Sequence, residues 1–530
     1  MLAPRRHSGG SLQRQLPDEI LSMIFTAAFY LCDDPLSAIS IPLTLSHVCA
    51  RWRKISISTS ILWTRLVLFF PAVDSAQTER TTAWLARSKL QPLEILLDFR
   101  VSDWWEHDEP EENHPFTVES LELVLKILLR HLSQWKTFEM LTDTWEPIHA
   151  FLCHINTNVG GVVKAPLLQS VALSRCNEYF VTKGASFQPD DLKEPVALFG
   201  GDSAELDRLR DVSLTGVHVD WTRSCLRNLH DLSLKFHSAD VMPSLPEFES
   251  MLSACPKLEG LTVLGWGPVL QDDSDGTHKT KTGSGCPQES KPVLHLPSLK
   301  SFSYGFVDSN YAIQFLGLLS MPSLHSFELQ DLAASMSLSV HAPLDSTPLI
   351  EWLILSHQCH SSPGPSHHIP LGQIECLELE GLRSSKEMFA RFLRAFASLK
   401  KICLSNADRN LMSALHPGER DRDDLLPGAV VIEGRERRRS SFASTSLTPL
   451  CPQLADMVCR RVDYKSLSEI VSARCQEGSG VQPLQTLEID SSGDEFEDEG
   501  SSHTLTNEDH ELLVKSGVDL VVHGRGEARV

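Results

Sequence analysis

The chain has 530 residues, of which 42% are hydrophobic and 22% are charged, and its formal net charge at pH 7 is −21. This balance is typical of a globular protein and excludes a wholly disordered chain. Eight carboxylates fall in residues 101–125 and eleven in residues 475–514, with no Lys or Arg in either stretch. The rest of the chain has no basic stripe for neutralising phosphates, so we expect no direct binding of nucleic acid.

Cysteine usage and the lengths of the apolar runs restrict the cellular setting. No two of the thirteen cysteines lie two to four residues apart, which argues against paired zinc ligands and against a disulfide framework. We find no signal peptide and no apolar stretch of the roughly 18 residues that a membrane span needs. We therefore expect an intracellular protein, cytoplasmic or nuclear, without membrane contact. Residues 1–15 are predicted to be a disordered N-terminus.

The first predicted elements are three short helices within residues 16–66. The first helix begins at Pro17, has acidic residues in its first turn, and carries apolar residues at helical spacing: Ile20, Leu21, Ile24 and Phe25. Pro35 and Pro42 predict a bent or shifted middle helix. Ser46 can cap a third helix, which carries Val48, Cys49, Trp52 and Ile55. Three helices of this size cannot bury all their apolar faces and need a partner or the rest of the chain.

Three segments of this region, LPDEILSMIF at 16–25, LSHVCARWR at 45–53 and LW at 62–63, resemble an F-box of the form common in basidiomycete fungal proteins. The resemblance implies a surface that docks a Skp-type adaptor of a cullin-RING ubiquitin ligase, formed by Leu16, Pro17, Ile20, Ile24, Val48 and Trp52. The alternative interpretation is that such apolar residues only seal the core of a helical subdomain. We expect that core role for Leu21, Phe25, Cys49 and Trp63.

A second pattern follows, in which an anchor Leu or Ile precedes apolar residues three and five positions later. The anchors are Leu168, Leu209, Leu229, Leu258, Leu299, Leu324, Leu349, Ile374, Leu399 and Leu484, and from Leu299 to Leu399 they are 25 residues apart four times in succession. The two later positions share one face of a short strand. Between strands lie helical stretches, clearest at residues 386–396.

A strand and a helix at a period of roughly 20 to 29 residues resemble leucine-rich repeats. Most units lack the Asn or Cys that usually follows eight residues after the anchor, so the repeats are irregular. The predicted fold class is α/β, with a three-helix F-box followed by an irregular leucine-rich-repeat solenoid, that is, a curved parallel sheet with helices outside.

Composition sets the remaining boundaries. The solenoid is predicted over residues 67–404, with loop insertions near 101–116, 267–292 and 356–370. A linker at 405–450, a terminal repeat or cap at 451–490 and an acidic tail at 491–530 complete the chain.

No catalytic motif is present, and the ligand-type residues His357, Cys359, His360, His367 and His368 match no structural zinc spacing. We therefore expect no enzyme activity, no metal and no cofactor. The predicted function is the substrate-recognition subunit of a Skp-cullin-F-box ubiquitin ligase, whose partners are the adaptor, through it a cullin, and an unknown protein substrate. The alternative is a repeat scaffold that does not recruit a ligase.

Overall fold

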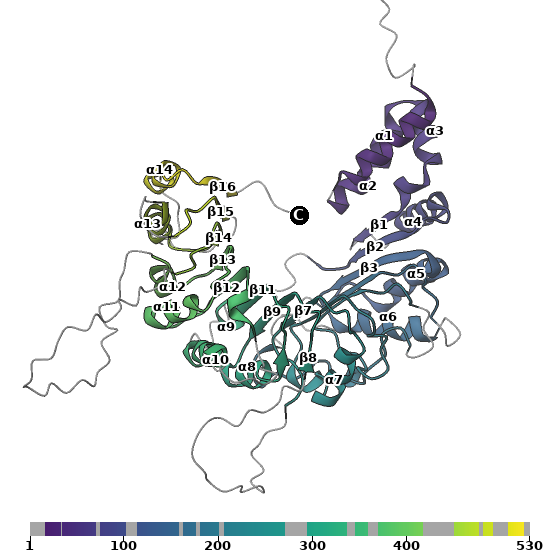
Figure 1. Cartoon of the computed structure of the whole chain (residues 1–530). Helices are drawn as coiled ribbons and strands as arrows, with labels where there is room; N and C mark the ends of the chain where they lie inside the picture. The colour runs from purple at the N-terminus through teal and green to yellow at the C-terminus, as the bar shows by residue number, and fades with distance from the viewer. Residues whose placement is uncertain are drawn as a thin grey trace, which may run out of the picture. The chain divides into compact units, whose positions relative to one another are not determined.

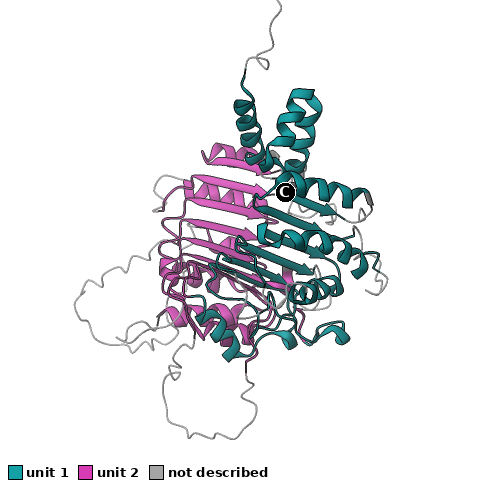
Figure 2. Ribbon diagram, turned by 90° about the vertical axis from the view of Figure 1, so that its right-hand side faces the viewer, with its two compact units in different colours: residues 1–180, 184–255, 530 teal, residues 181–183, 256–529 magenta. Residues whose placement is uncertain are grey.

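The structure is a computed structural model that describes residues 16–32, 34–69, 75–101, 114–157, 163–175, 181–200, 206–270, 294–335, 345–358, 369–416, 450–475, 481–490 and 507–523. The chain forms two compact units (Figure 2). Unit 1 comprises residues 1–180, 184–255 and 530, and unit 2 comprises residues 181–183 and 256–529. Each unit is built from parallel strands that alternate with helices (Figure 1), which confirms the predicted α/β class.

Unit 1 begins with helices that precede the first strand. Its N-terminal elements are α1 (Asp18–Tyr30), α2 (Pro35–Val48), α3 (Ala50–Ser58) and the 3-10 turn η2 (Ser60–Trp63). Its strands are β1 (Arg65–Phe69), β2 (Leu93–Asp98), β3 (Trp135–Thr142), β4 (Ser170–Arg175), β5 (Asp211–Thr215) and β6 (Asp231–Lys235), which pair in this order and in parallel. The connecting helices are α4 (Ser75–Ser88), α5 (Val118–Leu128), α6 (Trp145–Thr157) and α7 (Leu245–Ser253), with the 3-10 turns η5 (Leu129–Gln134), η7 (Asp190–Leu192) and η9 (Ala239–Val241).

Unit 2 continues the same alternation. Its main strands are β7 (Gly260–Leu264), β9 (Ser301–Phe306), β11 (Ser326–Asp331), β12 (Cys376–Glu380), β13 (Lys401–Ser405), β14 (Asp456–Arg460), β15 (Thr486–Asp490) and β16 (Asp519–His523), paired in this order. The short strands β8 (Leu294–His295) and β10 (Leu319–Ser320) pair with each other. The helices are α8 (Ser309–Leu316), α9 (Leu332–Ser335), α10 (Thr347–Gln358), α11 (Lys386–Arg394), α12 (Arg409–Ala414), α13 (Tyr464–Cys475) and α14 (Asn507–Lys515), with η10 (Leu371–Gln373).

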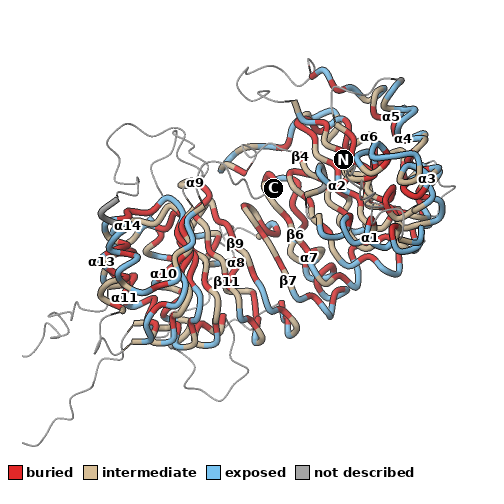
Figure 3. The backbone as a smooth tube through the Cα atoms, turned by 90° about the horizontal axis from the view of Figure 1, so that it is seen from above, coloured by how far each residue is buried: buried red, intermediate tan, exposed pale blue. Residues whose placement is uncertain are grey.

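The core of unit 2 is a ladder of apolar residues on one face of the strands. Phe302, Phe327, Leu377 and Ile402 occupy successive rungs and are fully buried. On β11 and β12 the neighbouring residues are less buried, so burial alternates with period two along these strands (Figure 3). This alternation is the one that the anchor pattern predicts. The strand face that lies against the helices is therefore the apolar one.

The predicted unit at Leu349 is wrong. Residues 347–358 form α10, and β11 pairs directly with β12 through the register Leu329↔Leu379. The segment around Leu349 is almost continuously apolar, and an apolar run of this length suits a helix as well as a strand. Pro348 stands in the first turn of α10, where proline is favoured, and this is the signal that distinguishes the two. The 25-residue spacing thus contains one unit of double length.

The C-terminal boundaries also differ from the prediction. Within the predicted linker, residues 409–414 form α12 and residues 417–449 lie outside the described residues. Within the predicted acidic tail, α14 and β16 form a further helix and strand, and β16 pairs with β15. In the sequence, the many carboxylates of this region draw attention away from Leu513 and Val518, which are both buried in the structure. Residues 1–15 and most of the predicted insertions, at 102–113, 271–293 and 359–368, lie outside the described residues.

Candidate functional site

Helix α1 has two apolar faces, of which only one is buried. Leu21, Phe25 and Phe29 recur every four residues and lie in the core. On the other side, Ile20, Met23 and Ile24 are 40%, 67% and 49% exposed. Residues three and four positions apart share one side of a helix, so these three side chains form a continuous stripe. A clustered apolar stripe in solvent, unlike a single exposed Leu, indicates an interaction surface.

An arginine holds the beginning of α3 beside the beginning of α1. The Arg51 guanidinium lies 2.6 Å from the Asp18 carboxylate and donates to the carbonyl oxygen of Leu16. Val48, at the end of α2, is three residues before Arg51 and is 50% exposed. The contacts therefore bring Val48 toward the exposed N-terminal end of α1, where Pro17 is also exposed. We define the candidate docking face, called the docking face below, as Pro17, Ile20, Met23, Ile24 and Val48.

Two predicted docking residues lie below this face. Leu16 is half-buried. Trp52 is also half-buried, and its ring centroid lies 4.8 Å from that of Phe25 in a tilted arrangement. Trp52 therefore supports α1 from beneath, with part of its surface still accessible.

Three of the four predicted core residues are buried, namely Leu21, Phe25 and Trp63, whereas the prediction for Cys49 is wrong. Cys49 is exposed because it is the N-cap of α3, with extended backbone geometry, and its sulfur accepts the backbone N–H of Trp52 at 3.4 Å. A cap residue lies outside the helix that it terminates.

Sequence reasoning missed five exposed apolar residues of this region, namely Met23, Tyr30, Leu31, Leu43 and Ile57. Met23 stands three residues after Ile20, so helical spacing places it on the same side of α1 as Ile20. Tyr30 and Leu31 end α1, and their exposure follows from where the helix stops.

The three helices are joined to the first strands by a shared core. The Trp63 indole donates to the carbonyl oxygen of Ser56 at 2.9 Å, and its ring meets that of Trp84 on α4 edge-on at 4.6 Å. The Arg87 guanidinium lies over the same indole, 4.4 Å from its centroid. The helical segment and the first strand-helix unit therefore pack as one body.

Arg65 on β1 adds a polar connection. It donates to the carbonyl oxygen of Cys32 at 2.8 Å and forms an ion pair with Glu94 on β2 at 3.0 Å. Lys136 on β3 contacts the same carboxylate at 2.7 Å. Burial disfavours the charged form of Glu94, but the hydrogen bonds and charges of Lys136 and Arg65 outweigh it and lower its pKa below the ordinary 4.5. The ion pairs of Glu94 with Arg65 and Lys136 thus stabilise the fold above pH 4.5. This contribution is lost as the pH falls through the lowered pKa of Glu94.

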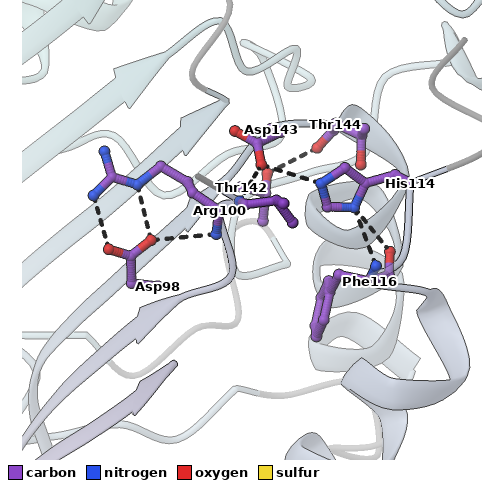
Figure 4. Close-up of polar contacts among 8 residues, drawn as sticks. Asp98, Arg100, His114, Phe116, Thr142, Asp143 and Thr144 are labelled. Atoms are coloured by element: carbon purple, nitrogen blue, oxygen red, sulfur yellow. Dashed lines mark hydrogen bonds and ion pairs between the residues drawn. The ribbon is translucent and has the colours of Figure 1, made fainter. Parts of the chain in front are cut away.

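A buried carboxylate fixes the two ends of the segment 102–113 (Figure 4). Asp143, directly after β3, accepts the backbone N–H of Val101 at 2.7 Å and contacts Nε2 of His114 at 3.1 Å. The Phe116 N–H donates to Nδ1 of His114 at 3.2 Å, so the ring proton that faces Asp143 is on Nε2. The Phe99 and Phe116 rings stack at 4.0 Å beside this contact. The arrangement holds Val101 and His114 close together, and we assign it no chemistry.

The strand face of unit 2 opposite the apolar ladder is polar and predominantly acidic. Its carboxylates include Glu328, Glu378, Glu380, Glu488 and Asp490. Arg460 lies 3.4 Å from Glu378 and 3.7 Å from Asp490. Burial, and next the charge of Glu328, raises the pKa of both Glu378 and Glu380. This face can contact a protein partner through charge and hydrogen bonds.

The described residues contain neither a candidate metal site nor a candidate membrane-spanning helix. Within the described ranges, no group of three or more His, Cys, Asp and Glu side chains is arranged to hold a metal ion. Of the His/Cys cluster only His357 is described, and the others lie at 359–368. No helix among the described residues combines the length and apolar composition that a membrane span requires.

Comparison with known families gives one assignment for this geometry. Residues 13–68 match the F-box-like family. The matched F-box-like segment contains α1, α2, α3, η2 and most of β1, so it includes the docking face, Trp63 and Arg65. The comparison with curated proteins found no match for the chain.

Proposed function

We propose that this protein is the substrate-recognition subunit of a Skp-cullin-F-box ubiquitin ligase. The F-box-like segment docks a Skp-type adaptor through the docking face, and the strand-helix repeats, which we assign as an irregular leucine-rich-repeat array, bind a protein substrate. The observation that carries the proposal is the exposed stripe of Ile20, Met23 and Ile24 within a segment that matches the F-box-like family.

The mechanism is proximity and requires no chemistry by this chain. A substrate held beside a ubiquitin-loaded enzyme experiences a high effective concentration of the reactive thioester. The shared core of Trp63 and Trp84 and the contacts of Arg65 support this role, because they join the adaptor-binding segment firmly to the first repeats. A flexible tether would spread the acceptor lysines over a larger volume.

The repeats offer two kinds of substrate-binding surface. The acidic strand face of unit 2 presents carboxylates and Arg460 in fixed positions. Val101 and His114, which Asp143 holds in place, mark a second position in unit 1. The alternative function is a scaffold without ligase recruitment, and it differs from the proposal only in the absence of adaptor binding.

The test is binding of a purified Skp-type adaptor to the full chain, measured by calorimetry. Ile24→Asp places a charge in the centre of a desolvated apolar interface, and we expect it to cost about 3 kcal/mol, or more than a hundredfold in Kd. The double substitution Leu16→Ala with Pro17→Ala should weaken binding in the same direction.

Ile57→Asp is the matched control, because Ile57 is also exposed, at 40%, and lies near the end of α3 but is not one of the docking-face residues. It should leave the affinity for the adaptor within about threefold of wild type, since it lies outside the interface. Circular dichroism of each variant confirms folding. Wild-type affinity in both docking-face variants would contradict the ligase assignment and favour the scaffold.

A further inference from the structure

Strand β16 ends the sheet of unit 2 with an exposed edge. No strand of the described residues lies beyond it. Val521 and Val522 are 44% and 39% exposed, although a strand inside such an array buries its apolar residues between neighbours. An exposed apolar edge strand is a template for pairing with another strand.

The hydrogen-bond pattern identifies the groups that face outward. The Asp519 N–H donates to the carbonyl oxygen of Gln485, so Asp519, Val521 and His523 direct their backbone groups toward β15. Because backbone groups alternate in direction along a strand, Leu520 and Val522 direct theirs to the outer edge. The edge therefore presents two N–H donors and two carbonyl acceptors.

The first strand of the sheet in unit 1 does not offer a complementary edge. The outer-edge carbonyl oxygen of Val67 on β1 accepts the Arg80 guanidinium at 3.3 Å. Leu66, Val67 and Leu68 are each only 2% exposed, because α2 and α4 pack against the strand. Head-to-tail pairing of β16 with β1 of another copy, which would build open filaments, is thereby blocked.

We propose that β16 pairs antiparallel with β16 of a second copy of this chain, about a two-fold axis at Val521. In this register Leu520 of each copy lies opposite Val522 of the other copy. Each such pair exchanges two hydrogen bonds, so all four outward groups of each strand are used. Val521 faces its own counterpart at the central position, where no hydrogen bonds are exchanged.

Charge selects this register. Centring the pair on Val521 places Asp519 of one strand opposite His523 of the other, at both ends of the interface, so that each carboxylate meets an imidazole. His523 already lies 3.1 Å from Glu488 of its own chain, on the same face of the sheet. A shift by two residues would remove the Asp519–His523 match. The strand is short, so we expect a weak, concentration-dependent dimer.

A cysteine cross-link in the full-length protein tests the register. Opposite residues at the central position have Cα atoms about 4.5 Å apart, within the range of a disulfide, so Val521→Cys should form an intermolecular disulfide in a glutathione redox buffer. The matched control Val522→Cys lies opposite residue 520 and should remain largely uncoupled. Peptide mapping separates these bonds from any formed by the native cysteines. Equal yields from the two variants would overturn the proposed pairing.

Sedimentation velocity of the unmodified chain tests the dimer itself. Val522→Pro removes an outward N–H, which an edge strand tolerates, and should shift the protein to monomer without unfolding it. Val514→Lys, on α14, should leave the dimer unchanged. A wild-type chain that stays monomeric at all concentrations, or grows without limit into larger assemblies, would overturn the proposal. Adaptor binding by the F-box-like segment is measured separately and does not depend on this outcome.

Discussion

Asp331 is a fully buried carboxylate at the end of β11. Its side chain accepts the backbone N–H groups of Ala333, at 3.0 Å, and Ala334, and so caps α9. Burial raises its pKa from 3.8 to about 6, and the two N–H donors only partly oppose this effect. Ionisation of this side chain therefore works against folding at neutral pH.

Asp331→Asn should make stability less dependent on pH. Because the folded-state pKa lies above the unfolded one, wild-type stability falls as the pH rises from about 4 to about 6 and is then constant. The amide keeps an acceptor for the capping N–H groups but does not titrate. We expect urea unfolding to show a gain of the variant over wild type on the order of 1 kcal/mol at neutral pH that disappears near pH 4. Parallel pH profiles would contradict the assignment.

The strand-helix unit is the next scale, and β11 shows how its two faces differ. Phe327 is fully buried, with its ring centroid 6.1 Å from that of Phe302 on β9, whereas Glu328 lies on the acidic face. In a stacked array each strand is covered by the units on both sides. A change on the apolar face therefore affects neighbouring units, and a change on the acidic face does not.

Phe327→Asp should destabilise the units of β9 and β12 as well as its own. A carboxylate in the apolar ladder lacks a partner, and we expect a loss of several kcal/mol, on the order of 3 or more, and a lower Tm. Glu328→Lys, one residue later, is the control and should cost less than about 0.5 kcal/mol, because it also relieves repulsion with Glu378 and Glu380. Equal losses of Tm would contradict the two-faced strand.

The elements also show what sequence patterns predict well. Nine of the ten anchor positions precede strands, because alternation of buried and half-buried residues is visible in the sequence at Phe327 and its equivalents. The prediction of a strand after Leu349 is wrong because a continuous apolar run has no period that separates strand from helix. Strand β16 was not predicted because the carboxylates around it dominate the composition of that segment.

Helical spacing predicts that α1 is amphipathic, whereas the docking role of Ile20 and Ile24 is implied only by the resemblance to an F-box. Cys49 could not be placed by spacing alone, since the exact boundary between α2 and α3 decides whether it is a core or a cap residue.

At the scale of the whole molecule, the F-box-like segment and the first repeats share a core. A substitution that destabilises one of them should therefore also destabilise the other. Trp63→Ala removes the indole between Ser56 and Trp84 and should cost about 3–5 kcal/mol. We expect faster hydrogen exchange both in α1 to α3 and in β1 and β2, measured by mass spectrometry.

Trp52→Ala is the matched control, because Trp52 is half-buried and contacts Phe25 within the helical segment. Its effect on exchange should stay within α1 to α3. Exchange that rises only in the helices for both variants would show that the two regions unfold independently.

The carboxylate of Asp143 has a consequence for engineering the chain. Val101 and His114 are both held by this one side chain, so the two described residues that flank positions 102–113 lie close together. The cost of closing a loop grows only slowly with its length, by about 0.6 kcal/mol for each doubling. The sequence composition predicts a loop insertion here, and we therefore expect that an epitope tag or a fluorescent domain inserted among these twelve positions leaves the pairing of β2 with β3 intact. This segment is therefore a suitable site for inserting a label with which the protein can be followed in cells.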